Sequence, residues 1–202
     1  MEGGRQKMIA SMLSLNRSDC KALKITDSYS IHRVVYDLFP GRLRNFLFAD
    51  KWGNFNLRKI LIVSDHKPVP HKYGDIESKQ IPDSFLAHDH YGFEVTLNPT
   101  KRDKQTGKTV AIRGRENLHQ WFLGKTTSLG FDIKPESLEI RYAGVQTFDL
   151  GNGKVVTHNS ATFVGKLKVT NREIFQNAFR NGIGRAKGFG FGLLQIVPLK
   201  MQ

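Results

Sequence analysis

Apolar and polar residues alternate along the chain in two ways, one typical of strands and one typical of helices. In the first half, strands are predicted at 8–15, 46–49 and 57–64, with a polar loop after the first and a turn at 51–54. A helix capped by Asp27 or Ser28 precedes the second strand, with Ile31, Val34, Val35 and Leu38 as its apolar face, and ends at residues 39–41. The order is therefore β-α-β-β. Residues 65–89, with three prolines, are predicted to be irregular and to hold the remainder of the first small domain and a linker.

The second half starts a similar cycle. Strands are predicted at 93–97, 138–142, 162–169 and 193–197, helices at 115–129 and after a capping-box pattern at Thr170–Glu173, and a hairpin with its tip at 151–153. This β-α-β-β-α-β order is the ferredoxin-like plan. We therefore predict an α+β protein with two tandem ferredoxin-like domains, at 1–87 and 88–202, and a C-terminal glycine-rich loop.

The glycine-rich loop, residues 182–194, joins the last helix to the last strand. Its glycines are Gly182, Gly184, Gly188, Gly190 and Gly192. Glycine lets backbone N–H groups approach an anion, and Arg185 and Lys187 add positive charge. The spacing is not G-x-G-x-x-G and no Gly-Lys-Ser/Thr occurs, which excludes the familiar nucleotide-binding loops. Two interpretations remain, a loop that binds a polyanion and a crossing of two closely packed backbones.

Charge narrows the choice of partner. The chain has 31 basic and 18 acidic residues and a net charge of +13, as expected of a protein that binds phosphates, so nucleic acid is the leading partner. A membrane surface is the alternative, but the basic residues form no amphipathic helix, and we expect no membrane contact. The single cysteine, Cys20, and the lack of a signal peptide or a long apolar run predict a cytoplasmic protein.

A basic segment at 98–108 is the clearest candidate for RNA contact. It carries Lys101, Arg102, Lys104 and Lys108 against one acidic residue, and Arg113 and Arg115 follow. A thin basic hairpin suits a distorted or terminal part of an RNA stem, because the major groove of A-form RNA is deep and narrow. A solvated loop with no partner is the alternative.

The seven histidines offer one candidate for catalysis. Those between residues 66 and 90 lack a third and a fourth ligand, so we expect no metal site. His119 is expected at the surface, and His158, close to Lys154, could face RNA or water. His32 differs because Tyr29 lies one helical turn before it and Arg33 adjoins it. An imidazole, a phenol and a cation together suit acid/base cleavage of RNA by its own 2′-hydroxyl, although a single helix histidine is more often an ordinary surface residue.

Four segments together resemble a known family. They are residues 182–194, Tyr29-Ser30-Ile31-His32-Arg33 running to Leu38-Phe39, Leu97–Arg102 with Gly107-Lys108, and Phe163–Leu167. In order and spacing they are similar to the CRISPR repeat-processing endoribonucleases of the CasE type, which are subunits of the Cascade complex. The resemblance spans nearly the whole chain.

This resemblance implies a function and a set of roles. Such enzymes have two ferredoxin-like domains and bind the hairpin of CRISPR repeat RNA. They cut it at the 3′ base of the stem without metal or cofactor, leave a 2′,3′-cyclic phosphate and a 5′-hydroxyl, and stay with the mature guide RNA among the other Cascade subunits. His32 would be the acid/base residue and Tyr29 its partner, with the basic segment in the RNA groove. Arg185 and Lys187 would lie beside the catalytic helix or the RNA backbone.

Some positions depart from the family pattern. Asp37 stands where some relatives carry a lysine, so Arg33 or Lys154 would have to supply a third catalytic cation. Glu94 and Thr96 stand where relatives often have basic residues. The competing functions are a non-catalytic subunit that caps a guide-RNA hairpin and a general nucleic-acid binder.

Overall fold

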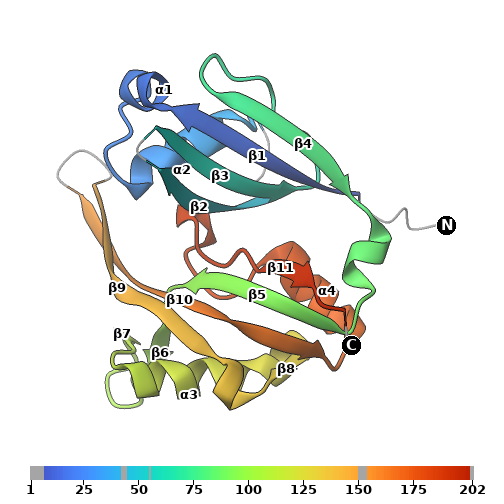
Figure 1. Cartoon of the computed structure of the whole chain (residues 1–202). Helices are drawn as coiled ribbons and strands as arrows, with labels where there is room; N and C mark the ends of the chain where they lie inside the picture. The colour runs from blue at the N-terminus through green and yellow to red at the C-terminus, as the bar shows by residue number, and fades with distance from the viewer. Residues whose placement is uncertain (1–6, 42–44, 55, 150–153, 201–202) are drawn as a thin grey trace. The chain divides into compact units, whose positions relative to one another are not determined.

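The computed structural model describes residues 7–41, 45–54, 56–149 and 154–200. The chain folds into two compact units. Unit 1 runs as far as Asp83 and also includes Gly188–Gly190, whereas unit 2 contains Ser84–Lys187 and continues from Phe191. In Figure 1, β1 to β4 belong to unit 1 and β5 to β11 to unit 2. No helix among the described residues is long and apolar enough to cross a membrane.

Unit 1 is an antiparallel sheet with two helices. Its elements are β1 (Met8–Asn16), α1 (Arg17–Ala22), α2 (Ser28–Asp37), β2 (Phe46–Asn54), β3 (Leu57–Ser64) and β4 (Asp75–Ile81). The strand order is β2-β3-β1-β4, and each neighbouring pair is antiparallel. The predicted helix and the three predicted strands are confirmed, although residues 51–54 belong to β2 and do not form the expected turn.

Three features of unit 1 differ from the prediction. The expected polar loop contains α1, which begins at a capping box between Asn16 and Asp19. The segment expected to be irregular contains β4, an edge strand whose exposed polar positions give little apolar pattern. None of residues 65–74, which connect β3 to β4, is helical, so the second helix of a β-α-β-β-α-β order is missing from this unit.

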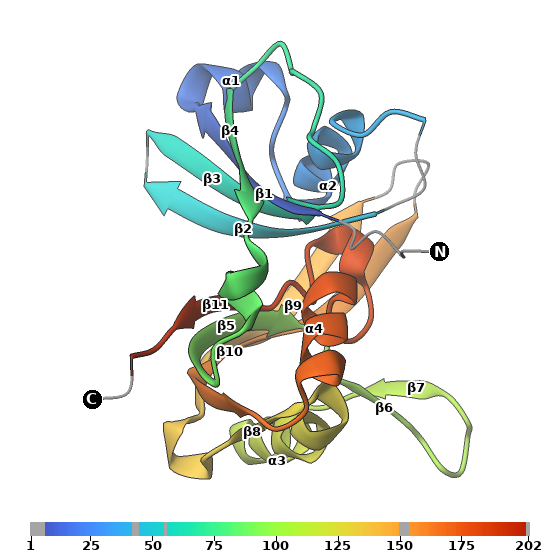
Figure 2. The ribbon, with the colours of Figure 1, turned by 90° about the vertical axis from the view of Figure 1, so that its right-hand side faces the viewer.

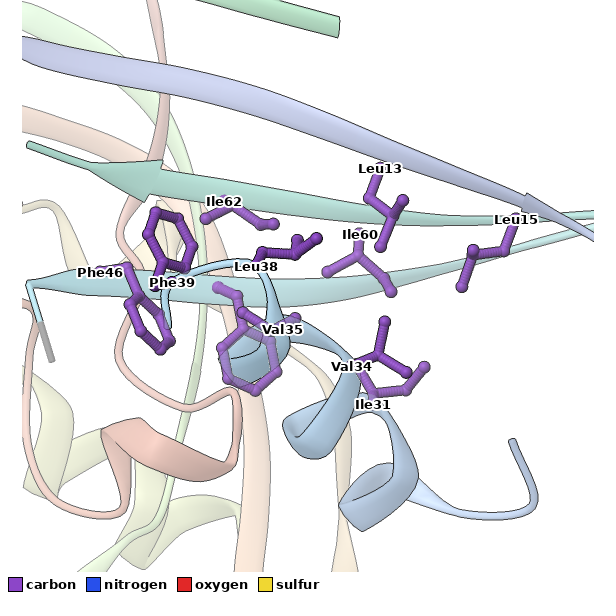
Figure 3. Packing of buried hydrophobic residues seen from close by; sticks show 11 residues of the cluster. Leu13, Leu15, Ile31, Val34, Val35, Leu38, Phe39, Phe46, Ile60 and Ile62 are labelled. Atoms are coloured by element: carbon purple, nitrogen blue, oxygen red, sulfur yellow. The ribbon is translucent and has the colours of Figure 1, made fainter. Parts of the chain in front are cut away.

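The core of unit 1 lies between α2 and one face of the sheet. Figure 3 shows Ile31, Val34 and Val35 of α2 facing the side chains of β1 and β3. At the end of the helix the rings of Phe39 and Phe46 stack with their centroids 4.6 Å apart. Burial of these apolar side chains holds α2 on the sheet and directs the opposite side of the helix away from it.

Unit 2 is a second antiparallel sheet, accompanied by a short hairpin. Its elements are β5 (His90–Leu97), β6 (Thr100–Arg102), β7 (Thr109–Ala111), α3 (Arg115–Thr126), η2 (Thr127–Leu129), β8 (Phe131–Ile133), η3 (Pro135–Ser137), β9 (Glu139–Asp149), β10 (Val155–Val169), α4 (Arg172–Asn181) and β11 (Gln195–Pro198). Two short 3-10 helices include residues of both units: η1 (Asp83–Leu86) begins at the last residue of the first stretch of unit 1, and η4 (Lys187–Phe189) ends in the Gly188–Gly190 stretch of unit 1. The strand order is β11-β5-β10-β8, and β9 pairs with the first part of β10. The predicted strands and helices are confirmed. The strands predicted at 138–142 and 162–169 are longer than expected, and β8 is a strand that was not predicted. The tip expected at 151–153 lies outside the described residues.

The helices α3 and α4 cover one face of this sheet (Figure 2). Tyr91 and Phe93, which alternate with half-buried residues on β5, point to that face. Phe122 of α3 stacks on Phe163 of β10 at 4.4 Å, and Phe175 of α4 packs against Tyr91 at 5.3 Å. The α4 cap corrects one prediction: Asn171, not Thr170, is the N-cap, because its side chain accepts from the backbone N–H of Ile174 at 3.1 Å.

Candidate active site and basic hairpin

The candidate catalytic residues lie on the side of α2 that does not face the sheet. Asp27 caps the helix by accepting from the backbone N–H of Ser30 at 2.8 Å, as one of the two predicted caps. Helical spacing then places Tyr29, His32, Arg33 and Tyr36 together, opposite the apolar face. His32 is half-buried, while Arg33 and Tyr36 are exposed.

The imidazole of His32 is held by the backbone of the glycine-rich loop. Its Nδ1 lies 2.5 Å from the carbonyl oxygen of Gly188, which is part of unit 1. A carbonyl oxygen can only accept, so Nδ1 donates and the neutral imidazole has its lone pair on Nε2. Among the described residues, none donates to or accepts from Nε2. The ring therefore offers one nitrogen for proton transfer.

Three aromatic rings surround this imidazole. Its centroid lies 5.2 Å from that of Tyr29 and 5.3 Å from that of Phe189, with interplanar angles of 15° and 19°. Tyr36 is closer, at 4.2 Å, and is itself packed edge-on against Phe46. The guanidinium carbon of Arg33 lies 5.9 Å from the Tyr29 centroid. Tyr29, His32 and Arg33, which the sequence singled out together, are thus neighbours.

Sequence reasoning missed three contacts of His32. Tyr36 follows it by four residues, so helical spacing could have identified this neighbour. The Gly188 carbonyl and the Phe189 ring have no such signal, because Gly188 is 156 positions from His32. Asp37, at the end of α2, is exposed and adds a negative charge where a third cation was sought.

The basic segment forms a hairpin in which β6 pairs with β7 from Thr100↔Ala111 to Arg102↔Thr109. Asp103 closes its turn by accepting from the backbone N–H and the hydroxyl of Thr106, at 2.7 and 2.8 Å. These hydrogen bonds lower the pKa of Asp103. Lys101, Arg102, Lys104 and Lys108 are exposed. The hairpin therefore presents four cations, on β6 and on a turn that is folded by its own contacts.

The other predicted RNA-binding residues have different surroundings. Arg113 and Lys154 are exposed. Arg115 donates to the Ile140 carbonyl at 2.5 Å, and Lys187 donates to the Asn181 carbonyl at the end of α4 at 2.7 Å. Arg185 donates to the Thr109 hydroxyl at 3.1 Å and so connects the glycine-rich loop to β7. Arg115, Arg185 and Lys187 therefore contribute to the fold of unit 2.

The glycines of the loop allow a close crossing of two backbone segments in unit 2. Gly192 has φ +88°, donates to the Thr96 carbonyl and accepts from the Ile183 N–H, both at 2.8 Å. A Cβ atom there would lie closer than 3.0 Å to the Ile183 carbonyl oxygen. The interpretation as a crossing of two backbones thus explains the glycine at position 192, whereas a phosphate-binding role for the loop stays a prediction.

The remaining histidines lie in different surroundings from His32. His158 is half-buried, with Nδ1 3.1 Å from the Asn98 amide nitrogen and Phe148 and Phe191 beside its ring. Burial lowers the pKa of His158. Arg172, the first residue of α4, donates to three groups of the linker: the carbonyls of Leu86 and His88 and the Asp89 carboxylate. His, Cys, Asp and Glu side chains in the part of the chain that the structure describes form no group that could hold a metal ion.

Comparison with models of known protein families identifies the family of this chain. The model of the family described as "CRISPR associated protein" matches residues 8–198. The chain belongs to this family.

Individual CRISPR associated proteins are similar to it over different lengths. The CRISPR-associated endoribonuclease Cse3 of Thermus thermophilus is 28% identical over 115 residues, which cover 52% of this chain and 54% of that protein, about half its length. The CRISPR system Cascade subunit CasE of Escherichia coli (strain K12) is 26% identical over 186 residues, covering 86% and 93%. A solved structure of Cse3 bound to a 19-nucleotide RNA has a TM-score of 0.83 at 21% identity, covering 95% of this chain and all of that one. This structural likeness shows a shared fold.

Proposed function

We propose that this chain is a metal-independent endoribonuclease that binds the stem-loop of CRISPR repeat RNA and cleaves it at the 3′ base of the stem. The observation that carries the proposal is the imidazole of His32, held through Nδ1 by the Gly188 carbonyl, in a chain of the CRISPR associated protein family. The names of the related proteins, an endoribonuclease and a Cascade subunit, supply the substrate class.

The proposed reaction is an internal transfer in the RNA. The 2′-oxygen attacks the neighbouring phosphorus, the 2′-hydroxyl proton passes to a base, and the bond from phosphorus to the 5′-oxygen breaks. The leaving 5′-oxygen takes a proton from an acid, so the products are a 2′,3′-cyclic phosphate and a 5′-hydroxyl and no water is consumed. His32 is the acid/base group, and Tyr29 and Arg33 interact with the phosphate. An imidazole handles these protons without a metal or a cofactor.

RNA binding is assigned to the cations of the basic hairpin. Lys101, Arg102, Lys104 and Lys108 are exposed on the hairpin and suit contacts with phosphates in an RNA groove. Further contacts are assigned to Arg113, Arg115, Lys154, Arg185 and Lys187. Arg115, Arg185 and Lys187 already make hydrogen bonds within unit 2, so we expect their removal to reduce stability together with RNA affinity.

Within the same proposal the chain has two ferredoxin-like domains, 1–87 and 88–202, and remains bound to the mature guide RNA beside other Cascade subunits in the cytoplasm. The shared strand order supports the two domains. In the ferredoxin-like plan the fourth strand lies beside the first, and the third lies between the first and the second. Unit 1 has this arrangement in the order β2-β3-β1-β4, and unit 2 has it in the order β11-β5-β10-β8, with β5, β8, β10 and β11 as its first to fourth strands. In the first domain a loop replaces the second helix.

Cleavage of the repeat RNA from the same genome, in EDTA, tests this function. We expect cutting by the unaltered protein and by His66→Ala, which removes an exposed histidine of the same unit, and none by His32→Ala. The upstream product should end in a cyclic phosphate. Tight hairpin binding without cutting would favour the non-catalytic subunit, and equal affinity for unrelated hairpins with steep salt dependence would favour the general binder. Cutting that requires a metal would refute the mechanism.

A further inference from the structure

Two consecutive residues of the glycine-rich loop contact His32 in different ways. The Gly188 carbonyl oxygen lies 2.5 Å from Nδ1, and the Phe189 ring stacks on the imidazole at 5.3 Å and 19°. Neither residue carries a group that can transfer a proton. Their contact with the one candidate acid/base side chain therefore calls for a role other than proton transfer.

We propose that Gly188 and Phe189 form a positioning segment that makes Nε2 of His32 the nitrogen that transfers protons. This inference rests on the proposed function, because it assigns an atom of the same active site. The carbonyl of Gly188 has no proton to donate, so Nδ1 keeps its own proton whether the imidazole is neutral or charged. The proton that is gained and lost during cleavage is then the one on Nε2.

The Phe189 ring supplies a second restraint. A histidine held only at Nδ1 can still turn about that hydrogen bond, which would move Nε2 away from the reacting oxygens. Phe189 and Tyr29 both lie nearly parallel to the imidazole, and their own centroids are 6.4 Å apart. If the two rings lay on opposite faces of the imidazole, their centroids would be separated by almost twice the distance from the imidazole to either ring. The observed separation is much shorter, so the two rings do not enclose the imidazole. They limit its rotation.

The glycine that follows Phe189 agrees with this role. Gly190 has φ +86°, and a Cβ atom there would lie 2.9 Å from the Phe48 ring, which belongs to the core of unit 1. A side chain at this position would push the segment away from the sheet and from His32. Gly190 is therefore explained by the close approach of the positioning segment, independently of any bound phosphate.

The protonated nitrogen can be measured without RNA. Nitrogen-15 spectra of the histidine side chains, assigned with His32→Ala, report which ring nitrogen carries the proton when His32 is neutral. We expect Nδ1 to be protonated and Nε2 to carry the lone pair in the unaltered protein and also in Phe189→Ala, because the backbone carbonyl of Gly188 remains in both. A proton on Nε2 in the unaltered protein would overturn the inference, even if the enzyme cleaves RNA.

Cleavage rates test the consequence for catalysis. With enzyme in excess, Phe189→Ala and Phe189→Leu should cut roughly 10- to 100-fold more slowly, because a small displacement of a catalytic group has effects of this size. The Kd for repeat RNA should stay within about threefold, and Phe189→Tyr, which keeps the ring, should restore the rate. Phe85→Ala, which removes a half-buried ring from unit 2, is the control for lost stability alone.

The nitrogen-15 spectra and the cleavage rates distinguish a failure of the inference about His32 from a failure of the proposed function. Leucine preserves an apolar side chain, so a slow Phe189→Leu variant with an unchanged melting temperature supports positioning. A wild-type rate in both Phe189→Ala and Phe189→Leu would overturn it. If the unaltered protein cuts no repeat RNA at all, the proposed function fails, and the nitrogen-15 spectra alone decide the inference about His32.

Discussion

Replacement of Gly192 by alanine tests whether the glycine-rich loop needs glycine for a close crossing of backbones. Gly184 provides a matched control in the same loop. Both residues have positive φ, +88° and +75°, so alanine is strained at either site. They differ in space, because a Cβ at Gly184 would meet no atom closer than 3.9 Å, whereas one at Gly192 would overlap the Ile183 carbonyl.

The expected magnitudes follow from these contacts. A left-handed alanine costs about 1–2 kcal/mol, part of which is offset because alanine reduces the entropy of the unfolded chain. We therefore expect Gly184→Ala to lower the free energy of unfolding by about 1 kcal/mol. Displacement at Gly192 also disturbs its two hydrogen bonds, to Thr96 and from Ile183, each worth about 0.5–1.5 kcal/mol. Gly192→Ala should then lose about 2–4 kcal/mol.

Thermal unfolding measures the difference. For a chain of this length, about 1 kcal/mol corresponds to roughly 2–4 °C in Tm, so Gly184→Ala should melt a few degrees lower and Gly192→Ala roughly 5–15 °C lower. An equal decrease in Tm in the two variants would mean that positive φ alone explains both glycines and that the backbone crossing does not require a glycine at position 192. A Gly192→Ala variant as stable as the unaltered protein would refute the geometry itself.

Three further predictions concern a helix, a buried histidine and the basic hairpin. Gly124→Ala, at an exposed position inside α3 with open space around it, should stabilise the protein by about 0.5–1 kcal/mol, measured by denaturant unfolding. Because burial lowers the pKa of His158, the unfolded chain binds more protons below about pH 6.5, and the folded state loses stability there as the pH falls. Tm should therefore fall more between pH 7.5 and 5.5, approximately, in the unaltered protein than in His158→Gln; parallel curves would contradict this. Lys101→Ala should weaken binding to RNA hairpins and reduce the slope of log K against log salt by about 1, while Lys168→Ala, exposed on β10, should leave the slope unchanged.

Much of the local structure can be predicted from the sequence because its causes are local. The apolar residues of α2 recur at helical spacing, Asp27 caps the helix that begins at the next residue, and β5 alternates buried and half-buried positions. The same locality explains the failures. β4 is an edge strand identified by its pairing with β1, and β8 has only three residues, so neither carries a pattern long enough to recognise.

The candidate site divides in the same way. The sequence alone determined that Tyr29, His32 and Arg33 share one side of a helix, because 3.6 residues per turn place them there, and that the basic segment is a hairpin. Tertiary folding, by contrast, brings Gly188 and Phe189 to His32, Arg185 to Thr109 and Gly192 to Thr96. These contacts join residues far apart in the chain, and a hydrogen bond to a backbone carbonyl leaves no mark in the sequence, since every residue has one.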